Sequence, residues 1–160
     1  MSRQSRSDGA ALHAAVSDLV RVYQFRDRDN ICCHDISVTQ CYALEALTHH
    51  GPMRLNGLAA LLFLDKSTAS RVVQTLIRKG YAKQEPDALD GRAMALEVTA
   101  AGRRLHTKIV AELIKQQERL LEDLSPEIRK AVVEVIRRLA AAADARFRAG
   151  VSTCCGPEQC

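Results

Sequence analysis

The chain has 160 residues, of which 47% are hydrophobic and 26% are charged, as in an ordinary folded domain with helical extensions. Its net charge of +4 mildly favours a polyanionic partner, and 4% aromatic residues without tryptophan argue against single-strand binding by base stacking. The polar N-terminus lacks an apolar signal segment, and no apolar run is long enough to cross a bilayer. We therefore expect a cytoplasmic protein with no membrane partner.

The N-terminal third is predicted to be helical with one interruption. Residues 1–8 are polar and are predicted to be disordered, and residues 10–28 have the apolar spacing of a helix. Ser37-Val-Thr-Gln40 has the spacing of a capping box and predicts a second helix that runs to His49. Residues 53–55 form a short link that is a candidate for a small strand.

The middle of the chain has the order helix, turn, helix, hairpin. Residues 56–64 predict a short helix, and residues 65–80 predict a second one. Residues 81–85 and 93–98 alternate loosely around a turn rich in Pro, Gly and Asp, which predicts a β-hairpin. This order is typical of a winged helix-turn-helix.

The helix predicted at residues 66–79 has two distinct faces. An apolar stripe recurs at helical spacing, and Asp65 is positioned to cap the N-terminus. The opposite face carries hydroxyls, an amide and guanidinium groups, which suit base edges and phosphates, although a solvated charged face is the plain alternative. Its members are Ser67, Thr68, Ser70, Arg71, Gln74 and Arg78.

Four segments between residues 64 and 102 follow one another in a distinctive order. They are Leu64-Asp-Lys-Ser-Thr-Ala-Ser-Arg-Val-Val, Leu76-Ile-Arg-Lys-Gly-Tyr, Asp90-Gly-Arg-Ala and Leu96-Glu-Val-Thr-Ala-Ala-Gly102. In these segments the chain resembles the MarR family of dimeric winged-helix transcription regulators, and the similarity covers roughly residues 36–124. The resemblance implies that the helix at 66–79 enters the major groove and that Arg92 of the Asp-x-Arg turn reaches the minor groove.

These observations together give a set of expected DNA contacts. Base readout is assigned to Ser67, Thr68, Ser70, Arg71 and Gln74. Phosphate contacts are assigned to Lys66, Arg78, Lys79 and Lys83. The expected partner is a pseudo-palindromic double-stranded operator, bound by a homodimer that acts as a repressor.

Two long helices remain after the winged helix is built. Thr99 is predicted to cap one that runs to Leu124, and Ser125-Pro126 starts another that runs to about Phe147. The resemblance implies that they form a dimerisation layer with the first helix, whereas packing on the chain's own core is the alternative. The expected fold is mostly α with a small β-hairpin wing, and the expected divisions are 1–36, 37–99, 100–148 and 149–160.

Six cysteines fall into two clusters, each with an adjacent pair and a third thiol downstream. Thiols in a reducing cytosol serve as ligands or redox groups more often than as disulfides. Three thiolates suit a trivalent metalloid such as arsenite, whereas zinc requires a fourth ligand, for which His34 is available. The metal-ligand candidates are Cys32, Cys33, Cys41, Cys154, Cys155 and Cys160.

Several other interpretations stay open for the cysteines. Cys41 lies on an apolar stripe and suits a small buried hydrophobe. Neighbouring thiols also suit redox sensing, a constitutive structural zinc site, or a structural role beside a small organic effector. No cofactor is required. An enzyme is not expected, because the sequence has no Cys-x-x-Cys, no Ser/His/Asp arrangement and no Gly-rich phosphate loop.

The remaining histidines have conventional interpretations. His49 and His50 are expected to stabilise a helix C-terminus. His106 lies among Arg103, Arg104 and Lys108 and is expected on a solvated basic face.

Overall fold

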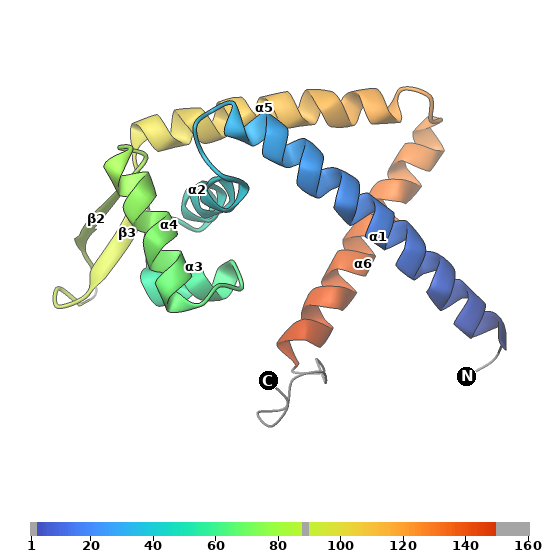
Figure 1. The fold of residues 1–160 in the computed structure, drawn as a ribbon, viewed down its shortest axis with the longest axis horizontal. Helices are drawn as coiled ribbons and strands as arrows, with labels where there is room; N and C mark the ends of the chain where they lie inside the picture. The colour runs from blue at the N-terminus through green and yellow to red at the C-terminus, as the bar shows by residue number, and fades with distance from the viewer. Residues whose placement is uncertain (1–2, 88–89, 150–160) are drawn as a thin grey trace. The chain divides into compact units, whose positions relative to one another are not determined.

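A computed structural model describes residues 3–87 and 90–149, which fold into helices and a small sheet (Figure 1). The helices are α1 (Arg3–Cys32), α2 (Val38–His50), α3 (Leu55–Leu61), α4 (Lys66–Arg78), α5 (Ala100–Leu121) and α6 (Pro126–Arg148). The strands are β1 (Met53–Arg54), β2 (Ala82–Pro86) and β3 (Met94–Val98). The chain forms two compact units, one up to Lys115 and one from Gln116 onward. The expected mostly helical winged helix-turn-helix is confirmed.

The first helix is longer than the sequence pattern predicted. α1 begins at Arg3, within the segment predicted to be disordered, and it ends at Cys32 rather than near residue 28. The added residues contain no proline, and Ile31 in the last turn is 2% exposed in the core. Burial of this side chain stabilises helical backbone that polar residues alone would not specify. Cys33 is therefore the member of the adjacent pair that lies in the following turn.

Side chains define the starts of the helices as predicted. Ser37 accepts a hydrogen bond from the Gln40 amide nitrogen (3.2 Å), and the Gln40 side chain accepts one from the Ser37 amide nitrogen (3.1 Å). This reciprocal pair is a capping box. Asp65 caps α4 by accepting from the Thr68 amide nitrogen at 2.8 Å, and Ser125 caps α6.

Three short strands form an antiparallel sheet in the order β1-β3-β2. β2 and β3 make the predicted hairpin, with Ala82 opposite Val98 and Pro86 opposite Met94. β1 is the small strand anticipated at residues 53–55, and Arg54 lies opposite Ala95 of β3. The sheet order therefore places the start of the helix-turn-helix beside the wing.

A short polar junction joins the sheet to α5. The Thr99 amide donates to the Tyr81 carbonyl oxygen at 3.0 Å, and its hydroxyl donates to the Gly80 carbonyl oxygen at 2.7 Å. The same hydroxyl oxygen accepts from the Gly102 amide at 3.1 Å. Thr99 thereby caps α5 as predicted and fixes its first turn against the chain that leaves α4.

The core of the first unit is assembled from every element of the winged helix. The predicted stripe of α4 faces inward, with Ala69, Val73 and Leu76 buried and with Val72 and Ile77 partly buried. The largest fully buried side chains are Ile31, Leu44, Leu47, Leu58, Leu76, Leu96 and Ile109. This core holds α4 by one face and leaves its polar face at the surface.

The second unit contains the end of α5 and all of α6. Arg129 donates from Nε to the Leu124 carbonyl oxygen (2.8 Å) and from Nη2 to that of Glu122 (3.0 Å). These bonds satisfy carbonyl groups in the connection that follows α5. In the part of the chain that is described, no helix is long and apolar enough to cross a membrane.

Candidate nucleic-acid interface

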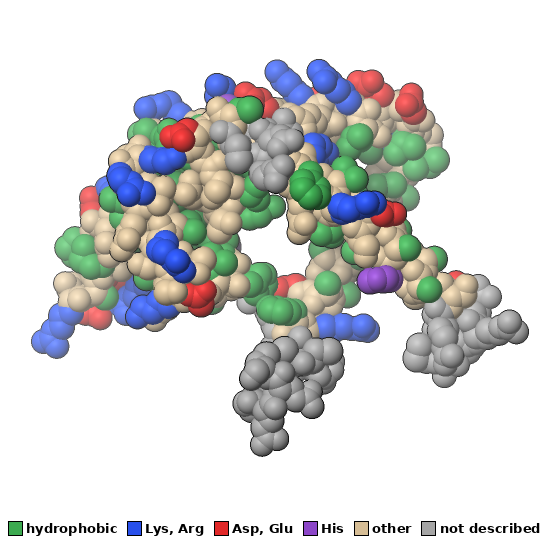
Figure 2. All heavy atoms as spheres, in the orientation of Figure 1, with side chains coloured by type: hydrophobic (Ala, Val, Ile, Leu, Met, Phe, Trp, Pro, Cys, Tyr) green, Lys and Arg blue, Asp and Glu red, His purple; other side chains and the backbone are tan. Residues whose placement is uncertain are grey.

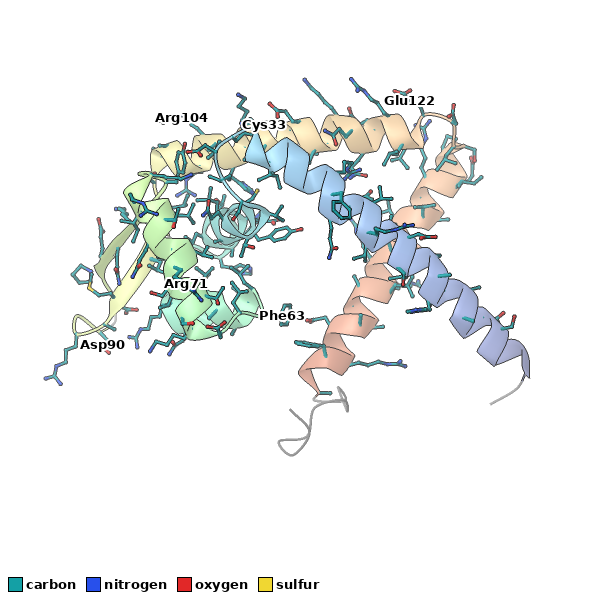
Figure 3. The ribbon with its side chains drawn as sticks, viewed as in Figure 1. Cys33, Phe63, Arg71, Asp90, Arg104 and Glu122 are labelled. Atoms are coloured by element: carbon teal, nitrogen blue, oxygen red, sulfur yellow. The ribbon has the colours of Figure 1, made fainter. Side chains whose placement is uncertain are left out.

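Most of the polar face of α4 is exposed, and Thr68 and Ser70 are its half-buried members. Arg71, Gln74 and Arg78 are exposed on successive turns of α4. Gln74 donates to the Ser70 hydroxyl at 3.4 Å, and Arg78 donates to the Thr75 hydroxyl at 3.1 Å. Figure 3 shows Arg71 on the outer side of α4, and Figure 2 shows Lys and Arg side chains over the surface that α4 and the wing form.

The first turn of α4 is organised by one carboxylate. Asp65 accepts hydrogen bonds from the hydroxyls of Ser67 (2.6 Å) and Thr68 (2.7 Å), in addition to the cap. These hydrogen bonds, the one from Ser67 foremost, hold the pKa of Asp65 far below its usual range. Both hydroxyl protons are donated to Asp65, so the hydroxyl oxygens are available only as acceptors for a donor group on a base edge, and a phosphate contact would require a hydroxyl to leave Asp65. Arg71 already uses the Thr68 oxygen in this way, at 3.3 Å.

Two of the lysines assigned to phosphate have carboxylate partners within the chain. Lys79 donates to the main-chain oxygen of Asp35 and forms an ion pair with its carboxylate at 2.9 Å. The phosphate contact expected of Lys79 would require it to leave Asp35 and stays a prediction. Lys83 lies 2.7 Å from Glu85 and 3.0 Å from Glu97, and these groups, Glu85 first, raise its pKa. Lys66 and Arg78 remain exposed, as the assignment requires.

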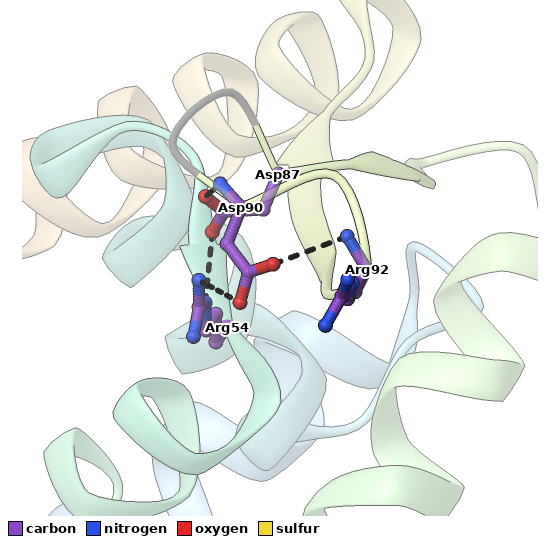
Figure 4. A network of polar contacts seen from close by, with 4 residues as sticks. All are labelled: Arg54, Asp87, Asp90 and Arg92. Atoms are coloured by element: carbon purple, nitrogen blue, oxygen red, sulfur yellow. Dashed lines mark hydrogen bonds and ion pairs between the residues drawn. The ribbon is translucent and has the colours of Figure 1, made fainter.

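The wing turn is held by an arginine that the sequence pattern did not single out. Arg54 of β1 donates from Nε to Asp87 at 2.9 Å and from Nη2 to Asp90 at 3.3 Å (Figure 4). Asp90 also accepts from the Arg92 amide nitrogen at 3.2 Å. The Arg92 side chain is exposed. The turn that carries it contains the carboxylates of Asp87 and Asp90, and both of them pair with Arg54.

Comparisons with known proteins agree with this geometry. A MarR family model matches residues 34–93. An uncharacterised HTH-type transcriptional regulator of Mycobacterium leprae (strain TN) is 30% identical over 112 residues, which are 70% of each chain. The chain belongs to the MarR family.

Solved structures of the MarR family share the fold. A MarR family protein from Bacillus stearothermophilus is similar with a TM-score of 0.80 at 19% identity, over 90% of this chain and 99% of that one. A crystal structure of MarR is similar with a TM-score of 0.72 at 25% identity, over 87% of this chain and 94% of that one. This MarR-family chain is thus a DNA-binding transcriptional regulator and not an enzyme, as expected from its sequence.

The wing contacts of this MarR-family chain give a testable expectation for Arg54. We expect Arg54→Ala to weaken DNA binding several-fold, because two adjacent carboxylates would lose their cation beside the DNA. Arg54 is not itself expected to touch phosphate, so the dependence of affinity on salt should keep its slope. Arg92→Ala, as the comparison variant, should weaken binding and reduce that slope by about 1. Anisotropy titrations at several salt concentrations measure both, and a reduced slope for Arg54→Ala would contradict this division of roles.

The structure corrects the interpretation of His106. Its side chain is 6% exposed, so it is part of the core and not of a solvated basic face. It lies four residues after Gly102 and three before Ile109, both of which are buried. This helical spacing could have placed His106 on the buried face of the helix from the sequence alone. The neighbouring Arg103, Arg104 and Lys108 indicated a solvated face instead. The imidazole meets His49 edge to face, with ring centroids 6.1 Å apart.

The burial of His106 predicts a dependence of stability on pH. Desolvation lowers the pKa of His106, the nearby His49 lowers it further, and Glu45 partly opposes both. A histidine with a lower pKa in the folded state stabilises the fold above its unfolded pKa of about 6.5, and this contribution is lost as the pH falls. We expect urea midpoints to decrease from pH 8 to pH 5, and to decrease less in His106→Gln. Equal pH profiles would contradict this assignment.

The described cysteines occupy two different environments. Cys33 is exposed in the turn between α1 and α2 (Figure 3), and Cys41 is buried in the core at 5% exposure. The Cys41 amide donates to the Ser37 carbonyl oxygen at 2.9 Å, so this N–H group cannot also donate to a thiolate at Cys41. Cys154, Cys155 and Cys160, and the side chain of Cys32, lie outside the described residues. Within the described side chains, no group of three or more His, Cys, Asp or Glu could hold a metal ion.

Proposed function

We propose that this MarR-family regulator is a homodimeric repressor that binds a pseudo-palindromic operator and leaves it when cysteine thiolates bind a thiophilic ion such as arsenite. The observation that carries the DNA-binding part is the exposed polar face of α4, with Arg71 and Gln74 outward and the apolar face in the core. Reading by two copies requires half-sites one helical turn apart.

Exposed apolar side chains support the homodimer. In α1, Leu12, Val16, Leu19 and Val20 are between 42% and 46% exposed. In α6, Val135 and Ile136 are 53% and 50% exposed. Regular apolar stripes on exposed helices are typical of interfaces between chains. Light scattering should give a mass twice the 17.6 kDa of one chain, and Leu19→Glu with Ile136→Glu should shift it toward the monomer. A monomeric wild type would refute this part.

The effector part of the proposal starts from Cys33. Its side chain is exposed, and Cys32 precedes it directly. A trivalent metalloid requires a third thiolate, which Cys41 or one of the tail cysteines would supply. Cys41 would have to leave the core to do so, since an apolar environment disfavours the charged thiolate.

The test is a DNA-binding titration with a duplex selected by the wild-type protein from random-sequence DNA. It is done in reductant, with and without arsenite, zinc or a mild peroxide. We expect arsenite to release the duplex, and Cys33→Ser to keep the basal affinity and lose the release. Serine variants of Cys32, Cys41, Cys154, Cys155 and Cys160 identify the other ligands, since each ligand variant should lose the release. A full response to arsenite in Cys33→Ser would refute the assignment of Cys33 as a ligand, and no response in the wild type would refute metalloid sensing.

Two rival effectors are distinguished by the same titration. Release by peroxide that added thiol reverses would indicate a redox sensor. A small organic effector is favoured by an open hollow of about 630 Å³ between α1 and α2, lined in part by Val20, Tyr23 and Tyr42. Small aromatic acids should then release DNA from the wild type and from Cys33→Ser alike.

A further inference from the structure

The turn that carries Cys33 is joined to the helix that is expected to read DNA. Lys79, the C-cap residue directly after α4, donates from Nζ to the main-chain oxygen of Asp35. The same ammonium lies 2.9 Å from the Asp35 carboxylate. Asp35 is two residues after Cys33, so the turn and the end of α4 share a contact although 44 residues separate them in sequence.

A second contact joins the same turn to α5. His34 Nε2 lies 2.9 Å from the Glu112 carboxylate, and this hydrogen bond lowers the pKa of Glu112. His34 and Asp35 are adjacent, so the two contacts hold neighbouring residues of one turn against two different helices. A change in the turn therefore alters the position of α4 relative to α5 unless one contact breaks.

The ends of the turn are fixed, whereas its middle is exposed. Ile31 and Ile36 are 2% and 3% exposed and lie in the core on either side. Cys33 and Asp35 are exposed, and Asp35 has a left-handed backbone with φ of 59°. A conformational change at Cys33 cannot spread along the chain past these two buried side chains without disturbing the core. It can spread through His34 and Asp35.

We propose that the contact between Asp35 and Lys79 transmits events at Cys33 to α4 and thereby changes affinity for DNA. This inference rests on the proposed function for its natural trigger. The Asp35 carboxylate is 90% exposed, so the ion pair is weak and can be exchanged at low cost, as a switch requires. Because coupling between two sites is reciprocal, DNA bound at α4 changes the turn as well.

The first experiment measures the dissociation constant for the selected duplex with and without arsenite and compares the ratio of the two between the wild type and its variants. Any change in basal affinity cancels in this ratio. Lys79→Met removes both contacts with Asp35, and because the exposed ion pair is weak we expect its ratio to fall about two- to fivefold below that of the wild type. Lys79→Arg keeps a cation and should retain most of the response. Lys130→Met removes a lysine that is exposed on α6 and should match the wild type. A wild-type ratio in Lys79→Met would overturn the relay.

Asp35→Asn provides a second variant if Lys79→Met folds poorly. Asparagine tolerates the left-handed backbone of residue 35, so this change removes the charge and keeps the turn. We expect a ratio below that of the wild type and above that of Lys79→Met, since the main-chain oxygen of residue 35 still accepts. An unchanged ratio in Asp35→Asn would likewise overturn the relay.

The second experiment does not depend on arsenite. Alkylation of Cys33 by iodoacetamide is followed by mass spectrometry, with and without the selected duplex. We expect DNA to change the rate at least threefold in the wild type and to leave it unchanged in Lys79→Met. If DNA does not change the alkylation rate of Cys33 in the wild type, the relay is overturned, even if arsenite releases the duplex. A DNA-dependent rate without any arsenite response supports the relay and refutes the metalloid function, so the two failures are distinguishable.

Discussion

Gly102→Ala is expected to destabilise the protein by about 3 kcal/mol or more, at the upper end of the cost of overpacking. A Cβ atom at this position would lie 2.1 Å from the Tyr81 carbonyl oxygen and 2.9 Å from its carbon. The obstacle is backbone, so no change of rotamer relieves it. The Tyr81 oxygen also accepts the Thr99 amide, so displacement of Tyr81 would disrupt the junction between the sheet and α5.

Gly57→Ala is the matched control for this prediction. Gly57 is in α3 and has no atom within 4 Å of the added Cβ, so alanine should stabilise by up to about 1 kcal/mol through helix propensity. Urea unfolding followed by circular dichroism measures both changes. A Gly102→Ala midpoint equal to that of the wild type would show that the close approach of α5 to Tyr81 is wrong.

Arg71→Ala is expected to cost about 1–3 kcal/mol of binding to the selected duplex and to relax base choice. Arg71 is exposed at the centre of the polar face of α4 and, among the residues that the structure describes, forms no ion pair with a carboxylate, so its guanidinium suits bidentate contact with a guanine edge. The measurement is a pair of anisotropy titrations, one with the selected duplex and one with random-sequence DNA. The loss should be larger on the selected duplex.

Arg104→Ala is the control for Arg71→Ala. Arg104 is an exposed arginine on α5, away from the polar face of α4 (Figure 3). Its removal changes the net charge equally and should change specific affinity by less than about threefold, as expected for a screened surface charge. An equal loss on selected and random DNA in Arg71→Ala would contradict base readout and would indicate a phosphate contact.

Helix caps and the apolar face of α4 were predicted correctly, because they depend on residues that are close together in the sequence. The capping box of Ser37 and Gln40, the cap at Asp65 and the stripe of α4 all form as predicted. Each involves residues within one or two helical turns, where spacing alone determines which groups meet. The predicted C-terminal end of α1 was wrong because burial of Ile31, a tertiary effect, extends the helix to Cys32, whereas nothing in the structure explains its early start at Arg3.

The exposed face of α4 was predictable from the sequence, but the pairings of the candidate site were not. The pattern of α4 indicated that Arg71, Gln74 and Arg78 face outward, and the minor-groove role that the resemblance implies for Arg92 stays a prediction. The sequence did not indicate that Arg54 pairs with Asp87 and Asp90, because that contact depends on β1 joining β3 on the side away from β2. For the same reason it did not indicate that Lys79 pairs with Asp35.

The sequence by itself therefore determined the order of the elements, the two faces of α4 and the family, because periodicity and short-range capping are local properties. The tertiary structure alone decided that His106 is buried, that Gly102 touches Tyr81, and that the Cys33 turn is joined to α4 and α5. These depend on segments that are distant along the chain and are brought together by the core. Periodicity shows which face of a helix is buried, but the residue that meets that face is fixed only when the segments pack.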